Sequence, residues 1–255
     1  MQPVTPQSLK LIEEICLNAW PCLQQILYDG WIARFANGYT RRSNSVNPIY
    51  AGTLNAAAKI EYCARLYRDR RLNPVFKITP FVQPANLDDL LAEAGYQKQA
   101  PTSVQLLELS NLPTNEPTCQ IQQWFAPAEQ WLSDYARMNQ VSAKNTGTLR
   151  DILNNIAPKT CFITLTNDGE TLACGLAVLD GGYVGLFDII TEPTQRGKGY
   201  GTQLILSLLH WAKANGAQTA YLQVMLENEP AVRTYAKLGF REVYQYWYRV
   251  FEEAG

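Results

Sequence analysis

The glycine-rich stretch Arg-Gly-Lys-Gly-Tyr-Gly at residues 196–201 places the strongest constraint on what this chain can fold into. It follows an apolar run at residues 184–190 and precedes apolar residues at helical spacing over 204–214. A strand, a tight glycine turn and a helix direct several unpaired backbone N–H groups to one point, where an anion can bind. The stretch therefore predicts a phosphate-binding turn between a strand and a helix.

Two familiar nucleotide-binding motifs do not fit this turn. A P-loop requires Ser or Thr directly after its lysine, whereas Gly199 follows Lys198. A dinucleotide fingerprint requires the spacing GxGxxG inside a parallel βαβ unit, whereas the glycines here are spaced GxGxG. Turn residues at 167–169 and 180–182 also predict that the preceding strands form an antiparallel meander. The turn is therefore not expected to bind a nucleotide in either of these ways.

Composition and charge restrict the partners and the compartment. The chain has a net charge of −1, which gives no general attraction to nucleic acid or to a membrane surface, and the Arg41-Arg42 pair is interpreted as solvated surface. The six cysteines include no CxxC pair and no metal-ligand cluster, so reduced thiols and no metal are expected. No segment reaches the length of a membrane span. We expect a cytoplasmic protein without nucleic-acid or membrane partners, and the sequence leaves a homo-oligomer open.

The order of predicted elements indicates an internal repeat. In each half a helix, a strand and a short helix lead to a Gly-aromatic pair and a last strand, and the pairs at 95–96 and 239–240 lie about 140 residues apart. We favour a duplication over a chance match of common elements. A proline-rich segment separates the halves, so we predict a first domain at residues 1–112, a linker at 113–118 and a second domain at 119–255. In the first domain, apolar spacing predicts a helix over residues 8–27 with a break at Pro21.

Two motifs together resemble the GNAT acetyltransferase superfamily. Residues 196–201 match its acetyl-CoA loop, in which Arg or Gln is followed by two residues, Gly, one residue and Gly or Ala, and Pro193 lies where the family commonly has a proline. Residues 228–240 resemble its NxxAxxxYxxxGF signature, at the expected distance downstream. The first half shares only the order of elements and lacks the loop. The resemblance implies an α+β fold of two GNAT-like domains, each a mixed, mostly antiparallel sheet flanked by helices, of which the first is degenerate and the second catalytic.

The resemblance also implies which residues bind acetyl-CoA. N–H groups of the turn and of the following helix would bind the pyrophosphate, because glycines allow a close approach of the backbone. N–H groups of the strand before the turn would polarise the thioester carbonyl, and Asn228 would contact the pantetheine arm or cap the next helix. The predicted cofactor-binding residues are Ile189, Ile190, Thr191, Arg196, Gly197, Lys198, Gly199, Tyr200, Gly201, Thr202 and Asn228.

Tyr235 and Asp188 are the predicted catalytic residues. Tyr235 matches the family's proton donor to the departing thiolate, a task that suits a phenol with a pKa of about 10, although helix tyrosines also pack without a catalytic role. Some relatives carry a glutamate base where this chain has Gln223, which cannot accept the proton. We favour Asp188 as the base over Glu192 and Glu227, with a structural hydrogen bond or a water relay as alternatives.

Strand alternation predicts that Asp188 lies on the same face as Leu186 and Ile190. A carboxylate on such an apolar face needs a polar partner such as an amine or a water. This expectation is the reason for preferring Asp188 to the other two carboxylates.

We therefore predict an N-acetyltransferase that moves the acetyl group of acetyl-CoA to a primary amine of a small molecule or peptide by direct attack on the thioester. The aromatic segment at residues 244–248 and the degenerate first domain are candidates for shaping the acceptor site. Two alternatives remain: a non-catalytic acyl-CoA-binding or sensing protein, which Gln223 favours, and an acyltransferase for longer acyl chains.

Overall fold

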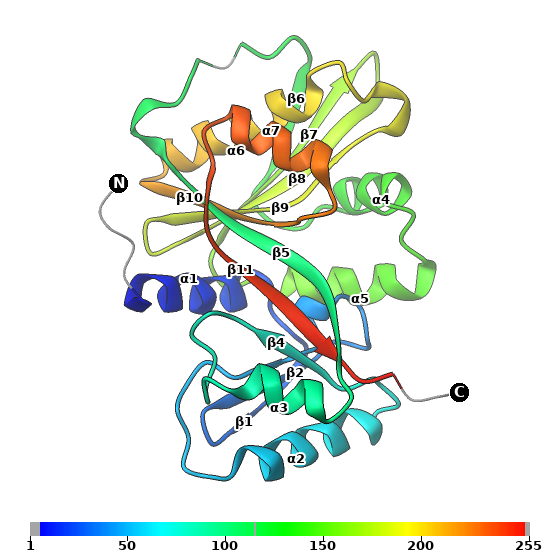
Figure 1. Ribbon diagram of the computed structural model, residues 1–255. Coiled ribbons are helices and arrows are strands. Elements are labelled where there is room, and N and C mark those ends of the chain that lie inside the picture. Colours follow the sequence, from blue (N-terminus) through cyan, green and yellow to red (C-terminus); the bar gives the residue numbers. More distant parts are fainter. Residues whose placement is uncertain (1–5, 115, 253–255) are drawn as a thin grey trace.

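The computed structural model describes residues 6–114 and 116–252, which form a mixed sheet with helices on both faces (Figure 1). The described strands follow the order β1-β2-β3-β4-β11-β5-β10-β9-β8-β7-β6. The pairs β3–β4 and β10–β9 are parallel, and the other pairs are antiparallel. The predicted mixed, mostly antiparallel sheet flanked by helices is confirmed. The predicted linker includes Asn115, which lies outside the described residues, as do the ends of the two predicted domains at 1–5 and 253–255.

The first half supplies one end of the sheet and the central strand β5. Its elements are α1 (Pro6–Ala19), β1 (Gln24–Tyr28), β2 (Trp31–Phe35), η1 (Arg41–Ser43), β3 (Val46–Asn47), α2 (Ala56–Arg68), β4 (Val75–Ile78), α3 (Leu87–Glu93), β5 (Gln97–Glu108) and η2 (Leu109–Asn111). The helix predicted over residues 8–27 is wrong in its last part, because α1 ends at Ala19 and residues 24–28 form β1. Positive φ angles at Asp29 and Gly30 make the tight turn that closes the β1–β2 hairpin.

The second half supplies the other end of the sheet. Its elements are β6 (Gln120–Trp124), α4 (Glu129–Met138), α5 (Ala143–Asn154), β7 (Lys159–Asn167), β8 (Glu170–Asp180), β9 (Tyr183–Thr191), η3 (Pro193–Gln195), α6 (Tyr200–Ala214), β10 (Thr219–Met225), α7 (Glu229–Lys237) and β11 (Arg241–Val250). Strands β7, β8 and β9 form the predicted antiparallel meander. The predicted strand, glycine turn and helix correspond to β9, η3 with residues 196–199, and α6.

The last strands of the two halves cross over into each other's part of the sheet. Strand β5 pairs with β10 along one edge and with β11 along the other, so β10 and β11 are not neighbours. Strand β11 in turn pairs with β4 of the first half. In Figure 1 these two strands run diagonally between the lower and upper parts of the molecule. The sheet is therefore continuous across the predicted linker, and the division into two domains stays a prediction.

A buried ion pair fixes the place where α1, β4 and β11 meet. The Lys77 ammonium lies 2.6 Å from Oε2 of Glu13, and the Tyr244 hydroxyl donates to the other oxygen of the same carboxylate. The ammonium also lies 3.9 Å from the ring centroid of Tyr246. Because buried charges are tolerated only when paired and hydrogen-bonded, these contacts hold β11 in a defined position beside the helix.

Candidate functional site

A pocket opens where β9 and β10 separate. Their parallel pairing runs from Tyr183 opposite Thr219 to Leu186 opposite Leu222 and then ends. Beyond that point the backbone groups on this edge of β9 have no partner in β10, so they are available to a ligand. The pocket has a volume of about 480 Å³, and its lining comes from β9, β10, α7, α4, β5, β11 and residues 40–42.

Asp188 lies at a bulge in β9 that faces this pocket. The pairing with β8 shifts by one residue, so Asp188 and Ile189 together lie opposite Gly175, and Asp188 has a φ of 51°. A Cβ atom at Gly175 would lie 2.6 Å from Cδ1 of Ile189. Glycine therefore leaves the Ile189 side chain its space against β8, and the bulge changes the direction of the neighbouring side chains.

The bulge breaks the alternation predicted for this strand. Leu186 and Ile189 pack in the core beside α6, whereas Phe187 and Ile190 pack in the core beside α4 and α5. The prediction that Leu186, Asp188 and Ile190 share a face is therefore wrong. A bulge adds one residue to the strand, and sequence periodicity carries no mark of it.

The carboxylate of Asp188 is buried and only partly hydrogen-bonded. Its side chain is 4% exposed, and Oδ1 accepts a hydrogen bond of 3.1 Å from the Tyr135 hydroxyl. Its Oδ2 atom has no hydrogen-bond partner among the described residues. Burial raises the pKa of Asp188 to about 6, against the opposing effects of the Arg42 charge and the Tyr135 hydrogen bond. A carboxylate with this pKa is ionised near neutral pH and can take up a proton.

Tyr235 and Asn228 reach the same pocket from α7. The Tyr235 ring lies edge-on to Phe240, with the ring centroids 5.8 Å apart, and burial raises the pKa of its phenol to about 12. The phenol therefore keeps its proton near neutral pH. The Asn228 side chain accepts a hydrogen bond of 3.3 Å from the N–H of Ala231 and so caps α7.

The other residues considered for the base differ from Asp188. Gln223 lines the pocket and accepts a hydrogen bond of 2.8 Å from the Tyr246 hydroxyl. Glu192 lies outside the lining and accepts a hydrogen bond of 2.6 Å from Arg137, while Glu227 is exposed and also lies outside it. Of the three carboxylates considered, Asp188 is the one that the described structure brings into the pocket.

The glycine turn forms an open surface at the start of α6. Gly197 and Gly199 have φ angles of 79° and 87°, and a Cβ atom at either position would meet no atom within 4 Å. The first N–H groups of α6 have no carbonyl partner within the helix, and Lys198 donates a hydrogen bond of 2.8 Å to Gln195 beside the turn. Exposed N–H groups with room above them suit a phosphate group.

The predicted site residues fall into two groups. Asp188, Ile189, Asn228 and Tyr235 line the pocket. The rest lie outside its lining, along the end of β9, the glycine turn and the first turn of α6: Ile190, Thr191, Arg196, Gly197, Lys198, Gly199, Tyr200, Gly201 and Thr202.

Sequence reasoning missed Tyr135 and Arg42, both of which line the pocket. Tyr135 carries no local signal, because it lies on an ordinary amphipathic helix. Arg42 carried only the signal of two adjacent arginines, which usually indicates solvated surface. Tyr246 and Tyr248, in the aromatic segment predicted as a candidate for the acceptor site, do line the pocket.

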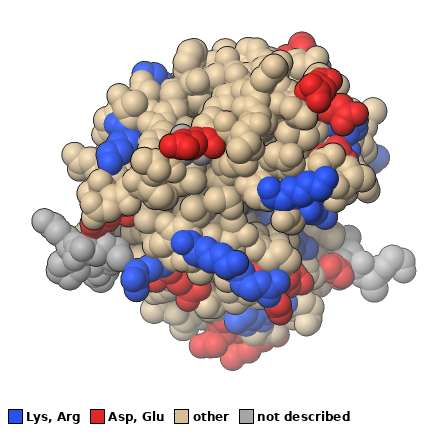
Figure 2. Space-filling view, turned by 90° about the horizontal axis from the view of Figure 1, so that it is seen from above, with Lys and Arg blue, Asp and Glu red and all other residues tan. Residues whose placement is uncertain are grey.

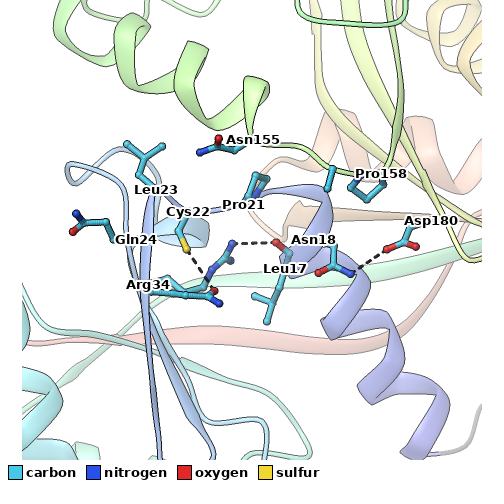
Figure 3. Close-up of a pocket in the computed structure, with 12 residues that line it drawn as sticks. Leu17, Asn18, Pro21, Cys22, Leu23, Gln24, Arg34, Asn155, Pro158 and Asp180 are labelled. Atoms are coloured by element: carbon cyan, nitrogen blue, oxygen red, sulfur yellow. Dashed lines mark hydrogen bonds between the residues drawn. The ribbon is translucent and has the colours of Figure 1, made fainter.

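A second cavity of about 600 Å³ lies between the end of α1, β1 and the residues before β7 (Figure 3). Its buried cation, Arg34, donates hydrogen bonds to the backbone carbonyls of Arg42 (2.8 Å), Leu17 (3.1 Å) and Trp20 (2.6 Å). These bonds connect β2 to α1 and to the segment that carries Arg42. The Arg34 guanidinium therefore has a structural role, because its hydrogen bonds position the segment that carries Arg42 in the lining of the first pocket.

Neither the surface charge, nor the metal-ligating side chains, nor the helix lengths indicate a further site in the described part of the chain. On the face that Figure 2 shows, Lys and Arg side chains lie among Asp and Glu side chains and form no continuous basic surface. In residues 6–114 and 116–252, no group of three or more His, Cys, Asp or Glu side chains could hold a metal ion. No helix in the described part of the chain is both long and apolar enough to cross a membrane.

Comparison with known proteins identifies relatives along almost the whole chain. Residues 7–249 match the family described as "Probable histone acetyltransferase Rv0428c C-terminal". The chain is 29% identical over 249 residues to "Uncharacterized N-acetyltransferase YobR" of Bacillus subtilis (strain 168), which covers 95% of this chain and 98% of that protein. A shorter match, 37% identical over 67 residues, covers 26% of this chain and 30% of "Uncharacterized N-acetyltransferase MJ1207" of Methanocaldococcus jannaschii.

Solved structures share the fold at low sequence identity. The "GCN5-related N-acetyltransferase from Kribbella flavida" superposes with a TM-score of 0.70 and 13% identity, covering 96% of each chain. The "Tandem GNAT protein from the clavulanic acid biosynthesis pathway" superposes with a TM-score of 0.62 and 14% identity, covering 78% of this chain and 70% of that one. At this identity the likeness concerns the fold alone.

Replacing Asp188 by Asn is expected to stabilise the protein at neutral pH. The folded-state pKa of about 6 lies above the unfolded value of 3.8, so the folded state binds this proton more tightly, and stability falls as the pH rises between these two values. Asp188→Asn has no charge to bury, so its free energy of unfolding should exceed that of the wild type by about 1–3 kcal/mol near pH 7. Urea denaturation at several pH values measures the difference.

The difference in the free energy of unfolding between Asp188→Asn and the wild type should shrink as the pH falls toward about 4. The wild-type carboxyl is then protonated in the folded state and, like the amide, carries no charge to bury. Glu227→Gln, at an exposed carboxylate, is the control and should show no such dependence. A variant of Asp188 less stable than the wild type near pH 7 would contradict the burial account.

Proposed function

The chain belongs to the family described as "Probable histone acetyltransferase Rv0428c C-terminal" and is an acetyltransferase with the GNAT fold, and we propose that it transfers the acetyl group of acetyl-CoA to a primary amine. The observation that carries this proposal is the buried Asp188 carboxylate, which belongs to the lining of the pocket where β9 and β10 separate and has one oxygen without a hydrogen-bond partner among the described residues. Tyr235 lines the same pocket with a protonated phenol. A proton acceptor and a proton donor therefore belong to one site.

The glycine turn is the proposed site for the pyrophosphate of CoA. Its support is the open space over Gly197 and Gly199 together with the unpaired N–H groups that begin α6. The unpaired edge of β9 at Ile189 and Ile190 would then bind the thioester carbonyl oxygen, where hydrogen-bond donors stabilise the charge that develops during attack.

The proposed reaction is a direct transfer. The lone pair of the acceptor nitrogen attacks the thioester carbonyl carbon, and the carbon–sulfur bond breaks as the new carbon–nitrogen bond forms. The nitrogen becomes acidic once it is bonded to this carbon, and the Asp188 carboxylate accepts its proton. Tyr235 gives its proton to the departing thiolate, which leaves as the CoA thiol.

Measuring thiol release from acetyl-CoA across a set of primary amines tests the proposal. Amine-dependent release is expected, and longer acyl-CoA donors should react more slowly. Tight binding of CoA without turnover of any amine would instead support a sensing protein, the reading that Gln223 favours. Faster release from longer acyl-CoA donors would identify an acyltransferase of different donor specificity.

Gly199→Val should weaken CoA binding by about 100-fold or more, because a side chain over the turn would displace the phosphate and remove charge-assisted hydrogen bonds that together contribute about 3 kcal/mol. Calorimetry with CoA measures the affinity. Gly216→Val is the matched control, because Gly216 also has a positive φ with open space for a side chain but lies beyond the other end of α6. Equal losses in both variants would point to backbone strain and remove the phosphate assignment.

The pH profile of the reaction should report the pKa of Asp188. For the wild type, kcat/KM should rise with pH through about 6, because the carboxylate must be ionised to accept a proton. In Asp188→Asn the rise should disappear, and kcat/KM should be lower than in the wild type by about 10²–10⁴-fold. Glu192→Gln is the control and should keep the rise, since Glu192 lies outside the pocket. An unchanged profile in Asp188→Asn would rule out Asp188 as the base.

Tyr235→Phe should lower kcat by about 10–100-fold while the affinity for CoA changes little, because the hydroxyl acts only when the thiolate leaves. Steady-state kinetics and CoA calorimetry on the same variant separate the two effects. Tyr62→Phe on α2 removes a hydroxyl far along the sheet and should change neither value. Wild-type kinetics in Tyr235→Phe would reduce Tyr235 to a packing residue.

A further inference from the structure

Arg42 lines the pocket with a guanidinium that makes a long ion pair with Asp188 and donates no hydrogen bond in the described structure. Its Cζ atom lies 4.5 Å from the ring centroid of Trp20 and 5.7 Å from that of Phe187. These rings hold it by stacking, which leaves the N–H groups at its edge free. No hydrogen bond from this guanidinium occurs in the described structure, and the side chain is 28% exposed. The two rings therefore fix the position of the Arg42 side chain, while its N–H groups form no hydrogen bond with the described residues.

The segment that carries Arg42 is held rigidly in a strained conformation. Thr40 combines a φ of 57° with a ψ of 136°, a combination that residues with a side chain rarely adopt. The Trp20 indole donates a hydrogen bond of 3.1 Å to the Thr40 hydroxyl, and Asn44 donates one of 2.8 Å to its carbonyl. The Arg34 guanidinium holds the Arg42 carbonyl at 2.8 Å. Strain that is held this firmly is typical of positions that orient a binding group.

The charged residues of the pocket lining are few. Arg41 and Arg42 are its cations, and Asp188 is its carboxylate among the described residues. Arg41 already donates a hydrogen bond to Gln99. Arg42 is thus the cation of the lining that donates no hydrogen bond within the described structure.

Arg42 and Asp188 lie side by side in the lining as a loose ion pair. Nη2 of Arg42 lies 3.9 Å from Oδ1 of Asp188, which is too long for a hydrogen bond. A small molecule with an amine and an anionic group on the same carbon atom would meet both at once: its nitrogen beside the Asp188 carboxylate and its anion beside the Arg42 guanidinium. Guanidinium groups bind carboxylates through two parallel hydrogen bonds, and stacking on aromatic rings leaves that edge available.

We propose that the acceptor is a free amino acid or a similar compact amine that carries a carboxylate beside the reacting nitrogen, and that Arg42 binds this carboxylate. The inference rests on the proposed acetyl transfer and identifies its acceptor. A peptide N-terminus has an amide at this place, and a lysine side chain has only methylene groups. Neither places a negative charge beside the guanidinium, so the arrangement favours the free amino acid over both.

Matched acceptor pairs test the proposal directly. Each α-amino acid is compared with its carboxamide, which keeps the amine and the side chain and removes only the charge. The wild type should prefer the carboxylate by about 10–100-fold in kcat/KM, as expected for charge-assisted hydrogen bonds of 1.5–3 kcal/mol. Arg42→Gln should abolish this preference, mainly through the KM of the carboxylate. Because the Arg42 charge also lowers the pKa of Asp188, both acceptors are compared at a pH well above 6, where the Asp188 carboxyl is ionised with or without Arg42.

Two further variants keep the result interpretable. Arg42→Lys keeps the charge but loses the planar fork, so it should retain part of the preference. Arg150→Gln, at an exposed pair with Glu129 on α5, should retain all of it. The comparison of carboxylate and carboxamide in the wild type does not depend on any variant. If the wild type shows no preference for the carboxylate, the proposal is overturned even where no variant folds.

The possible results distinguish a failure of the Arg42 assignment from a failure of the proposed acetyl transfer. Equal use of carboxylate and carboxamide by the wild type, or equal losses for both in Arg42→Gln, would overturn the assignment of Arg42 while acetyl transfer stands. The absence of turnover with every acceptor, despite bound acetyl-CoA, would overturn acetyl transfer and this inference with it. A carboxylate preference that disappears only in Arg42→Gln supports both.

Discussion

The position of β5 between β10 and β11 decides which side chains meet in the pocket. Strand β5 belongs to the first half of the chain, yet Thr102 pairs with Met225 at the end of β10, where β9 and β10 have already separated. On its other edge β5 holds β11, which brings Tyr246 and Tyr248 into the lining. The half that lacks a glycine turn therefore forms the wall opposite the bulge of β9. The first half of the chain therefore has a structural role at the pocket.

Buried polar contacts beneath the pocket keep that wall in place. Glu13 joins Lys77 and Tyr244, and Lys77 lies over the ring of Tyr246, whose hydroxyl bonds to Gln223. Removing one partner of a buried pair typically costs about 3–5 kcal/mol, because the other charge is left uncompensated. Gln223, which cannot serve as a base, thereby takes part in a network that runs from α1 to β10.

The sequence predicted the parts of the site that are local. The glycine turn, α6 after it, the meander before it and the capping role of Asn228 all depend on residues within a few positions of one another. Contacts between distant segments could not be predicted in this way: Arg42 reaches Asp188 across the sheet, and the bulge at Asp188 leaves no mark in the apolar pattern. The strand β1 was missed for a similar reason: Pro21 predicted a break in the helix, but the pairing with β2 is what shows that residues 24–28 form a strand beyond that break.

Three residues of the pocket lining have a strained backbone conformation. Thr40, Ala100 and Asp188 all line it and all have positive φ angles, and none of them is glycine. Such conformations cost about 1–3 kcal/mol each and persist only where neighbouring groups enforce them. Each has such a neighbour: the Trp20 indole bonds to Thr40, the Thr102 hydroxyl donates to the Ala100 carbonyl, and the Tyr135 hydroxyl donates to Asp188. These contacts fix the wall residues that lie around two groups of opposite charge, the Asp188 carboxylate and the Arg42 guanidinium, and these are the groups that the proposed acceptor would meet.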